Sequence, residues 1–466
     1  MDTKKLRQKI LDLAIRGKLV PQDPNDEPAS VLLERIRAEK EQLIKEGKIK
    51  RSKKSAATDK SHYENVPFEI PENWCWVTGN DIFNAMISCK PQGDEFKYID
   101  IDSIDNKNHR IISPKILKVK NAPSRASRYT QPGDVLFSMV RPYLKNIALV
   151  EEGSCIASTG FFVCSPMQLL TSEYCYYMML SDYVIYGLNQ YMKGDNSPSI
   201  NNGHITSWLY PIPPINEQLR ISAEIKKWFV FIDDLERGKI ELESLIKQVK
   251  STILDLAISG KLVPQDPNDE SAIELLKRIN PDFQPCDNSH YENLPQGWTI
   301  VGLHSVAEII TGSTPSKLNA EYYNGDVPFY KPNDLDQGRH VRCASEYLSQ
   351  QGKSISRSIP CNSIAVCCIG SIGKCGFIEK EGVTNQQINT IVPNDAIFPL
   401  YMYYFCNSST FIDELKSLSS AVTISIVNKS KLSTIQIPLP PIAEQKRIIS
   451  VIEKLYSHLD MITAEL

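Results

Sequence analysis

The sequence predicts an α+β protein in which two mixed α/β domains are separated by a long antiparallel coiled-coil helical frame. Three observations predict this fold class. A segment near the N-terminus recurs almost unchanged in the middle of the chain, the two long segments between the repeats are dissimilar, and apolar residues with heptad spacing accompany the repeats. Together they indicate a duplicated frame with pseudo-twofold symmetry, circularly permuted termini and two inserted domains.

The most informative feature of the sequence is an internal duplication. Residues 10–27 read ILDLAIRGKLVPQDPNDE, and residues 253–270 repeat this segment with a single difference. Residues 211–221 and 438–448 form a second pair, and both contain Pro-x-Pro-Pro-Ile-x-Glu-Gln. The offsets of 243 and 227 residues exceed the period of about 20–50 residues that is typical of solenoid proteins. The repeated segments are therefore interpreted as a frame that carries two domains.

Each Pro-rich segment is expected to open a long helix. From Ile221 to Leu256, eleven positions are spaced alternately four and three residues apart, and all except Lys239 are apolar. This period of 3.5 residues predicts a coiled-coil seam; the alternative is that each stripe packs on its own domain. Gly17 and Gly260 are expected to end frame helices in C′ positions. The residues assigned to the frame and to contacts between partner helices are Ile221, Ile225, Trp228, Ile232, Leu235, Ile448, Ile452, Leu455 and Leu459.

The chain termini are expected to complete the frame. By the two offsets, the C-terminal helix corresponds to the first half of the central frame helix, and the N-terminal helix corresponds to its second half. We therefore expect the C-terminal helix to run antiparallel to the central helix, with the termini close together. The predicted boundaries are an N-terminal frame helix and loop at 1–50, a linker at 51–67, a first domain at 68–210, a central helical region at 211–288, a second domain at 289–437 and a C-terminal frame helix at 438–466.

Composition and motifs exclude several classes of function. The net charge is −3 and the hydrophobic fraction is 42%, as in ordinary globular proteins, and no apolar run reaches the ~18 residues of a membrane helix. The dispersed Cys and His residues predict free thiols in a reducing cytoplasm and no zinc site. Gly370 to Lys374 resembles a phosphate-binding loop, but Cys368 and Cys375 replace its first Gly and its Ser/Thr. The sequence therefore predicts neither catalytic nor metal-binding residues.

Basic residues are concentrated locally although the chain is weakly acidic. Residues 106–133 contain seven Lys and Arg and no Asp or Glu. The second domain has a weaker concentration, which includes Arg339, Arg342 and Lys374. Such runs are typical either of a solvated surface or of contacts with the phosphates of a nucleic acid.

Over nearly its whole length the chain resembles the specificity (S) subunits of type I restriction-modification systems. The frame motifs at 211–218, 254–265 and 438–445 are the strongest basis for this resemblance. Within the domains, similar motifs are GDVLFSMVRPYLKN (133–146), ASTGF (157–161), GSTPSK (312–317), KPNDL (331–335), IGSIGK (369–374) and TNQQIN (384–389). One departure is the extra N-terminal helix, since some members begin directly in the first recognition domain.

The resemblance implies a non-catalytic DNA-recognition subunit. Each domain would be a target recognition domain that reads one half of a bipartite DNA site. Two adenine-N6 methyltransferase subunits with S-adenosylmethionine, and two restriction and translocase subunits with ATP and Mg²⁺, would be the partners, and the chain itself would hold no cofactor. The alternative from another class is an assembly scaffold whose two domains bind protein and do not read DNA.

Candidate DNA contacts follow from these two lines of reasoning. Lys and Arg side chains are expected to contact phosphates chiefly, whereas polar residues such as Asn201 and Gln387 are candidates for base edges. The candidates are Lys115, Lys118, Lys120, Arg125, Arg128, Arg141, Tyr143, Lys145, Asn201, Lys317, Lys331, Arg339, Arg342, Lys374, Asn385 and Gln387.

Overall fold

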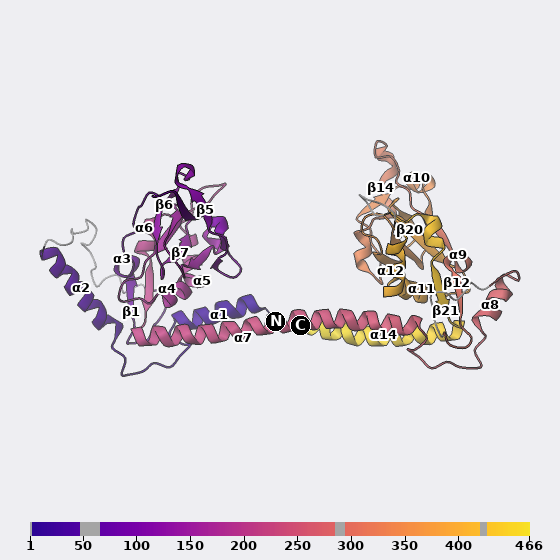
Figure 1. Cartoon of the computed structure of the whole chain (residues 1–466), viewed down its shortest axis with the longest axis horizontal. Helices are drawn as coiled ribbons and strands as arrows, with labels where there is room; N and C mark the ends of the chain where they lie inside the picture. Colours follow the sequence, from indigo (N-terminus) through magenta and orange to yellow (C-terminus); the bar gives the residue numbers. More distant parts are fainter. Residues whose placement is uncertain (1, 47–65, 285–293, 420–425) are drawn as a thin grey trace. The chain divides into compact units, whose positions relative to one another are not determined.

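The computed structural model describes residues 2–46, 66–284, 294–419 and 426–466 (Figure 1). They form two compact units, which we call unit 1 (Met1–Gly238) and unit 2 (Lys239–Leu466). The boundary lies inside helix α7 (Ile215–Ile258), which is 44 residues long. Almost all of the linker predicted at 51–67, and the predicted start of the second domain at 289, lie outside the described residues.

Unit 1 contains the N-terminal helices, domain 1 (the described residues of 68–210) and the first part of α7. Its other helices are α1 (Thr3–Ile15), α2 (Ala29–Lys45), α3 (Gly79–Ile82), η2 (Ile101–Ser103), η3 (Val119–Asn121), η4 (Pro142–Leu144), α4 (Ser172–Met179), α5 (Asp182–Asn189) and α6 (Asn202–Ser207). Its strands are β1 (Cys75–Thr78), β2 (Glu95–Ile99), β3 (Ile104–Asp105), β4 (Arg110–Ile111), β5 (Lys115–Lys118), β6 (Ala126–Thr130), β7 (Val135–Ser138), β8 (Ile147–Leu149), β9 (Cys155–Ser158), β10 (Phe161–Cys164) and β11 (Leu209–Ile212).

Unit 2 contains the last part of α7, domain 2 (the described residues of 289–437) and the C-terminal helix. Its other helices are α8 (Ala272–Ile279), α9 (Leu303–Val306), η5 (Ala320–Tyr322), η6 (Asp334–Gln337), α10 (Gln350–Ser354), α11 (Pro399–Cys406), α12 (Ser409–Ser417), α13 (Lys429–Ser433) and α14 (Ile442–Glu465). Its strands are β12 (Thr299–Gly302), β13 (Ala307–Thr311), β14 (Tyr323–Tyr330), β15 (Glu346–Leu348), β16 (Ser358–Ile359), β17 (Ser363–Cys367), β18 (Cys375–Ile378), β19 (Gly382–Thr384), β20 (Ile388–Pro393) and β21 (Gln436–Leu439).

The two domains share one topology although their sequences differ. The strand order is β5-β2-β9-β6 in one sheet of domain 1 and β15-β14-β19-β16 in the matching sheet of domain 2. The neighbouring sheets match likewise, as β10-β7-β8 and β20-β17-β18, with β13 added in domain 2. Both four-stranded sheets include one parallel pair, β2 with β9 and β14 with β19. The duplication therefore extends from the frame into the fold of the domains.

Antiparallel helix pairs form the frame part of each unit (Figure 1). In unit 1, α1 lies beside the first part of α7, and Arg7 Nη2 donates to the carboxylate of Asp233 at 2.6 Å. In unit 2, the Tyr456 hydroxyl of α14 donates to the Lys250 carbonyl at 2.9 Å, and Lys239 Nζ donates to the Leu466 carbonyl at 3.0 Å. In unit 2, residue numbers rise along α7, from Lys239 to Lys250, while those of the contacting residues fall along α14, from Leu466 to Tyr456. The two helices are therefore antiparallel, as the sequence predicts for the C-terminal helix.

The repeated Glu-Gln pair explains why each Pro-rich segment is followed by a helix docked on its own domain. Gln218 is fully buried, and its Nε2 donates to the Leu169 carbonyl at 2.8 Å while its Oε1 accepts from the Thr171 amide. Gln445 makes the matching bonds in unit 2, to Ala396 and Phe398. A buried amide needs such partners, because an unmade hydrogen bond costs about 1–3 kcal/mol.

Both predicted helix ends at glycine are confirmed. Gly17 and Gly260 have φ of 67° and 69°, the left-handed conformation that glycine adopts without steric cost. After α1, the amide of Gly17 donates to the Ala14 carbonyl, and the amide of Lys18 donates to the Leu13 carbonyl at 2.8 Å. These two bonds form the Schellman motif that satisfies the last carbonyls of a helix.

The buried face of α7 differs from the predicted seam. Trp228 is 40% exposed, Val249 37% and Leu256 38%, although the 3.5-residue pattern placed all three in it. A straight helix repeats every 3.6 residues and drifts by about 20° per heptad from that pattern. Each part of α7 instead buries the face that meets its own domain and its partner helix. The buried residues of this face are Ile221, Ile225, Ile232, Ile246, Ile253, Leu254, Ala257 and Ile258.

Candidate nucleic-acid interface

An open hollow of about 750 Å³ lies in domain 1, where several connections between strands meet. Asp100 follows β2, Asn146 precedes β8, and Ser158 ends β9. Arg125 and Arg141 also line the hollow. We call it the domain 1 hollow. It combines cationic groups with polar groups that donate and accept hydrogen bonds, which are the groups that contact phosphates and base edges.

The turn between β7 and β8 holds two basic residues in an uncommon conformation. Arg141 and Lys145 have φ of 47° and 56°, and they flank the η4 turn. The matching turn between β17 and β18 has glycines instead, Gly370 and Gly373, with φ of 81° and 87°. Both glycines belong to the segment that resembles a phosphate-binding loop. The left-handed backbone of the turn is sufficient to explain why glycine occupies these two positions. Left-handed non-glycine residues cost about 1–3 kcal/mol and concentrate at functional sites.

Contacts within domain 1 fix this turn. Arg141 Nη2 donates to the Asn196 carbonyl at 2.7 Å, and its amide donates to the Pro198 carbonyl at 2.8 Å. Lys145 Nζ forms an ion pair of 2.9 Å with Asp182 at the start of α5. Lys145 is therefore neutralised, whereas Arg141 keeps its charge beside the hollow.

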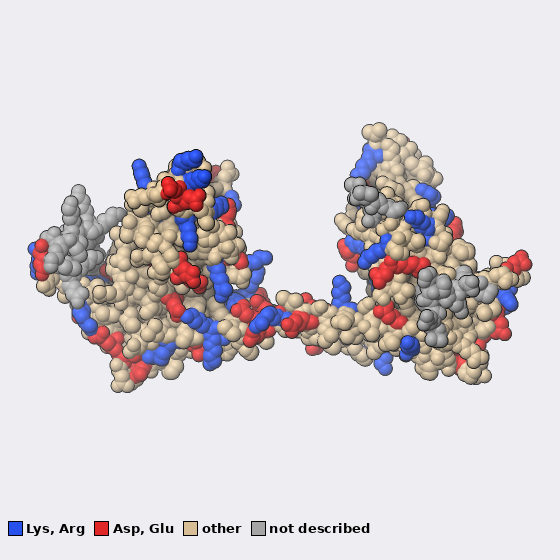
Figure 2. All heavy atoms as spheres, in the orientation of Figure 1, with Lys and Arg blue, Asp and Glu red and all other residues tan. Residues whose placement is uncertain are grey.

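The other candidates of domain 1 differ in whether their side chains already have a partner within the chain. Lys118, Lys120 and Arg125 are exposed and have no ion-pair partner among the residues that the structure describes, whereas Lys115 is paired with Asp100. Arg128 lies on β6, and Figure 2 shows Lys and Arg side chains gathered at the end of domain 1 that carries β5 and β6. The remaining candidates are Tyr143, which is 44% exposed, and Asn201, whose side chain caps α6 by accepting from the His204 amide at 3.2 Å.

Most basic candidates of domain 2 are engaged in ion pairs. Lys331 is paired with Glu346, Lys374 with Asp336 at 2.7 Å, and Arg342 with Glu379. Arg339 contacts both Glu379 and, at 3.1 Å, Glu453 of α14, so it attaches domain 2 to its frame helix. In domain 2, Lys317 is exposed and has no partner among the described residues.

Two amide candidates of domain 2 contact each other. Asn385 Nδ2 donates to Gln387 Oε1 at 2.9 Å, and the backbone N–H of Gln387 donates to Asn385 Oδ1 at 3.2 Å. Asn385 is 8% exposed. This pair forms the turn between β19 and β20, which matches the turn between β9 and β10 at the domain 1 hollow.

Sequence reasoning missed Asn146. It is 6% exposed, and its amide lines the domain 1 hollow without a hydrogen bond to any residue that the structure describes. The available signal was its place at the end of the motif at 133–146, next to the predicted contact Lys145. Local sequence shows neither burial nor the lack of a partner.

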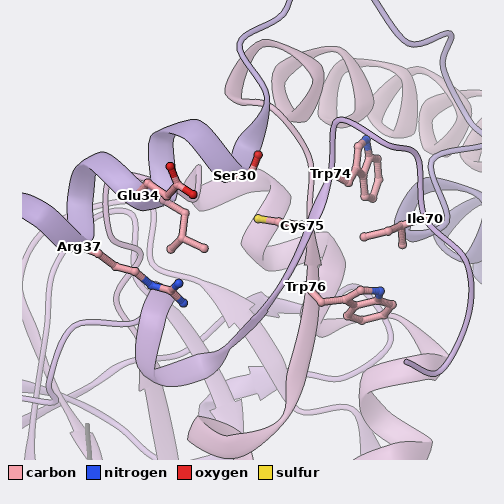
Figure 3. A pocket seen from close by; sticks show the side chains of 8 residues that line it. Ser30, Glu34, Arg37, Ile70, Trp74, Cys75 and Trp76 are labelled. Atoms are coloured by element: carbon pink, nitrogen blue, oxygen red, sulfur yellow. The ribbon is translucent and has the colours of Figure 1, made fainter. Parts of the chain in front are cut away.

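A second, smaller hollow of about 310 Å³ lies between α2 and β1 in unit 1 (Figure 3). Glu34 and Arg37 project from α2, and Trp74, Cys75 and Trp76 from the opposite segment. Burial raises the pKa of the Cys75 thiol to about 12, so this thiol stays protonated and is a poor nucleophile.

The sequence also led to expectations about metal ions, cysteines and membrane helices. Among them, no cluster of His, Cys, Asp and Glu has an arrangement that could bind a metal ion. Their cysteines are free thiols. Within the same part of the chain, no helix combines the length and apolar character needed to cross a bilayer.

Comparisons with known proteins agree with these features. Residues 295–466 match the type I restriction modification DNA specificity domain. The EcoEI specificity subunit of Escherichia coli is 28% identical and covers 99% of this chain and 90% of its own length; the EcoAI subunit, also 28% identical, covers 97% and 88%.

A solved chain from a study of complex assembly and conformational transition of the type I R-M system has a similar fold. Its TM-score is 0.67 at 24% identity, over 86% of this chain and 94% of that one. Residues 295–466 thus match the type I restriction modification DNA specificity domain, and the chain as a whole is similar to type I restriction enzyme specificity subunits, as its motifs predicted.

Proposed function

We propose that this chain is the DNA sequence-recognition subunit of a type I restriction-modification complex, in which each domain reads one half of a bipartite site. The observation that carries this proposal is that two domains with one topology have different side chains at matching positions. Arg141 in domain 1 matches Gly370 in domain 2, and Asn146, which precedes β8, matches Lys374, which precedes β18. A shared fold with different side chains at matching positions is suited to two readers of different sequences.

The charge distribution supports DNA contact with assistance from partners. Phosphate contacts supply most of the nonspecific affinity for DNA. A chain with a net charge of −3 has no overall positive charge with which to attract the duplex. Among the described residues, Lys118, Lys120 and Arg125 of domain 1 and Lys317 of domain 2 have no ion-pair partner. These residues would position their domains on the duplex, while polar side chains read base edges.

The chemistry would reside on partner subunits. Two methyltransferase subunits with S-adenosylmethionine would modify adenine N6, and two restriction and translocase subunits with ATP and Mg²⁺ would cleave unmodified DNA. The chain itself would supply the frame that holds the two reading domains and the partners together. In this proposal its residues bind and orient DNA and take no part in bond making or breaking.

A domain exchange tests the proposal. The chain is co-expressed with the methyltransferase subunit of its own system, residues 68–210 are replaced by the matching domain of a relative, and the methylated sequence is determined by sequencing. We expect one half of the methylated motif to change and the other half to persist.

The reciprocal exchange of residues 289–437 is the matched control, and it should change the other half. A change in both halves from one exchange, or in neither, would contradict the two-reader proposal. If neither exchange changed the methylated motif, the result would favour the scaffold alternative, in which the domains contact protein.

A further inference from the structure

We propose that Asn146 is a specificity-determining residue, and that its amide reads the major-groove edge of an adenine that enters the domain 1 hollow. This inference rests on the proposed function, because it assumes that domain 1 reads a DNA half-site. It adds the residue, the base and the place of contact.

The first observation is a largely buried residue whose side-chain amide makes no hydrogen bond with the described residues. Five Asn and Gln side chains are buried in the described part of the chain: Asn146, Gln218, Asn385, Asn389 and Gln445. The last four make hydrogen bonds with side chains or backbone, whereas Asn146 makes none with a described residue. The amide atoms of Asn146 are not among the buried side-chain atoms that lack a hydrogen bond, so the amide is open to the hollow that Asn146 lines. A ligand in the hollow would therefore find a free donor and a free acceptor on this side chain.

The second observation is that the backbone around Asn146 is held firmly. Lys145 precedes it in the left-handed conformation and is tied to Asp182. His109 Nδ1 lies 3.1 Å from the Lys145 carbonyl, and the Asn146 carbonyl accepts from the Ser138 amide at 3.1 Å. A side chain on such a turn is oriented before a ligand arrives, which lowers the entropic cost of binding.

The asparagine amide has one hydrogen-bond donor group and one acceptor, and this combination favours one base over another. Adenine presents the N7 acceptor and the N6 donor in the major groove, and an asparagine amide can bond both at once. Guanine presents two acceptors there and is read by two donors, as from arginine. One donor and one acceptor on Asn146 therefore fit adenine better than guanine.

The charged lining of the hollow is mixed: Arg125 and Arg141 are cations, while Asp102 and Asp100, which is paired with Lys115, are anions. Arg125 is exposed without an ion-pair partner among the described residues, and Arg141 keeps its charge because its side chain bonds a carbonyl. These two guanidinium groups can bind phosphates while Asn146 contacts the base. Lys374, at the matching position of domain 2, is tied to Asp336, so the inference concerns domain 1 alone.

The test uses the complete chain with the methyltransferase subunit of its system. Asn146→Ala and Asn146→Asp are compared with the native chain by sequencing methylated DNA. We expect one adenine·thymine position in the half-site read by domain 1 to lose preference by about tenfold or more with Asn146→Ala. The second half-site should stay unchanged. Asn146→Asp removes the amide donor while keeping the shape of the side chain, and it should disturb the same position.

A stability measurement separates reading from a structural role. Because Asn146 has no partner to lose, Asn146→Ala should leave the midpoint of unfolding unchanged or raised. The matched control is Asn389→Ala, which breaks the bond from Thr311 to Asn389 at 2.8 Å and should lower the midpoint. A lowered midpoint for Asn146→Ala would overturn the inference.

Failure of the inference and failure of the proposed function give different results. An unchanged methylated motif with Asn146→Ala, or a change confined to the second half-site, would overturn the role of Asn146 and leave the two-reader proposal standing. Absence of sequence-specific methylation by the native complex would overturn both.

Discussion

At the scale of single residues, arginines that look equivalent in the sequence have different environments. Arg125 is exposed without an ion-pair partner among the described residues. Arg342 contacts Glu379, and this hydrogen bond is the main reason why the pKa of Glu379 falls to about 2. The Glu379 carboxyl is therefore ionised at any pH suitable for DNA binding, and Arg342 is already neutralised. Arg125 has its full charge available for a phosphate.

This difference predicts opposite results for two substitutions. Arg125→Ala should weaken binding of the complex to all DNA sequences and lower the slope of log affinity against log salt by about one, because one phosphate contact is lost. Arg342→Ala should leave that slope unchanged. Fluorescence anisotropy with labelled duplexes at several salt concentrations measures both slopes. A lower slope for Arg342→Ala alone would reverse the assignment.

At the scale of secondary-structure elements, two glycines of unit 1 have different roles. Gly17 ends α1 with φ of 67°, and an added Cβ would lie 2.4 Å from Pro71 Cγ. Gly238 lies inside α7, where an added Cβ would meet nothing within 4 Å. The first glycine is therefore required by geometry, and the second only weakens its helix.

Alanine substitutions should therefore change stability in opposite directions. Gly17→Ala combines backbone strain with a clash and should lower the free energy of unfolding by more than about 1 kcal/mol. Gly238→Ala should raise it by about 0.5–1 kcal/mol, because glycine is the poorer helix former. Denaturant titrations followed by circular dichroism measure both values. Equal destabilisation by the two changes would show that α7 does not continue through Gly238.

At the scale of the whole molecule, each unit has its own frame helices and its own core. In unit 2, Ile253 and Ile258 of α7 share one apolar cluster with Ile448 of α14 and with residues of domain 2. The ion pair of Arg447 with Asp269 and the bond of Gln265 to Glu444 also lie within this unit. The contacts that hold unit 2 together are thus contained in it.

We therefore expect residues 239–466 to fold when expressed alone. A shorter fragment, 260–466, lacks Ile253, Leu254 and Ile258, which are worth about 1.5–3 kcal/mol each when buried, and should be much less stable. Thermal unfolding followed by circular dichroism compares the two fragments. Similar melting temperatures would mean that α7 does not contribute to the core of unit 2.

The sequence by itself determined the duplication, the helices that follow the Pro-rich segments and the relation to specificity subunits. These features depend on local patterns: repeated motifs, apolar spacing, and glycines such as Gly17 and Gly260 that terminate helices. The buried face of α7 was predicted less well, because a 3.5-residue pattern cannot show that each part of the helix packs on a different domain. The reading residues remain predictions that the sequence motivates.

Only the tertiary structure decided which side chains are available. Arg339 meets Glu453, 114 positions away, and no local pattern encodes that pairing. Asn146 lies beside an open hollow whose lining also includes Tyr98 of β2 and Ser158 of β9, two strands that pair in parallel. Burial and neutralisation depend on what lies near a residue in space, and sheet topology sets those neighbours. The sequence therefore predicts the kinds of side chains in the interface, and the fold decides which of them can reach a ligand.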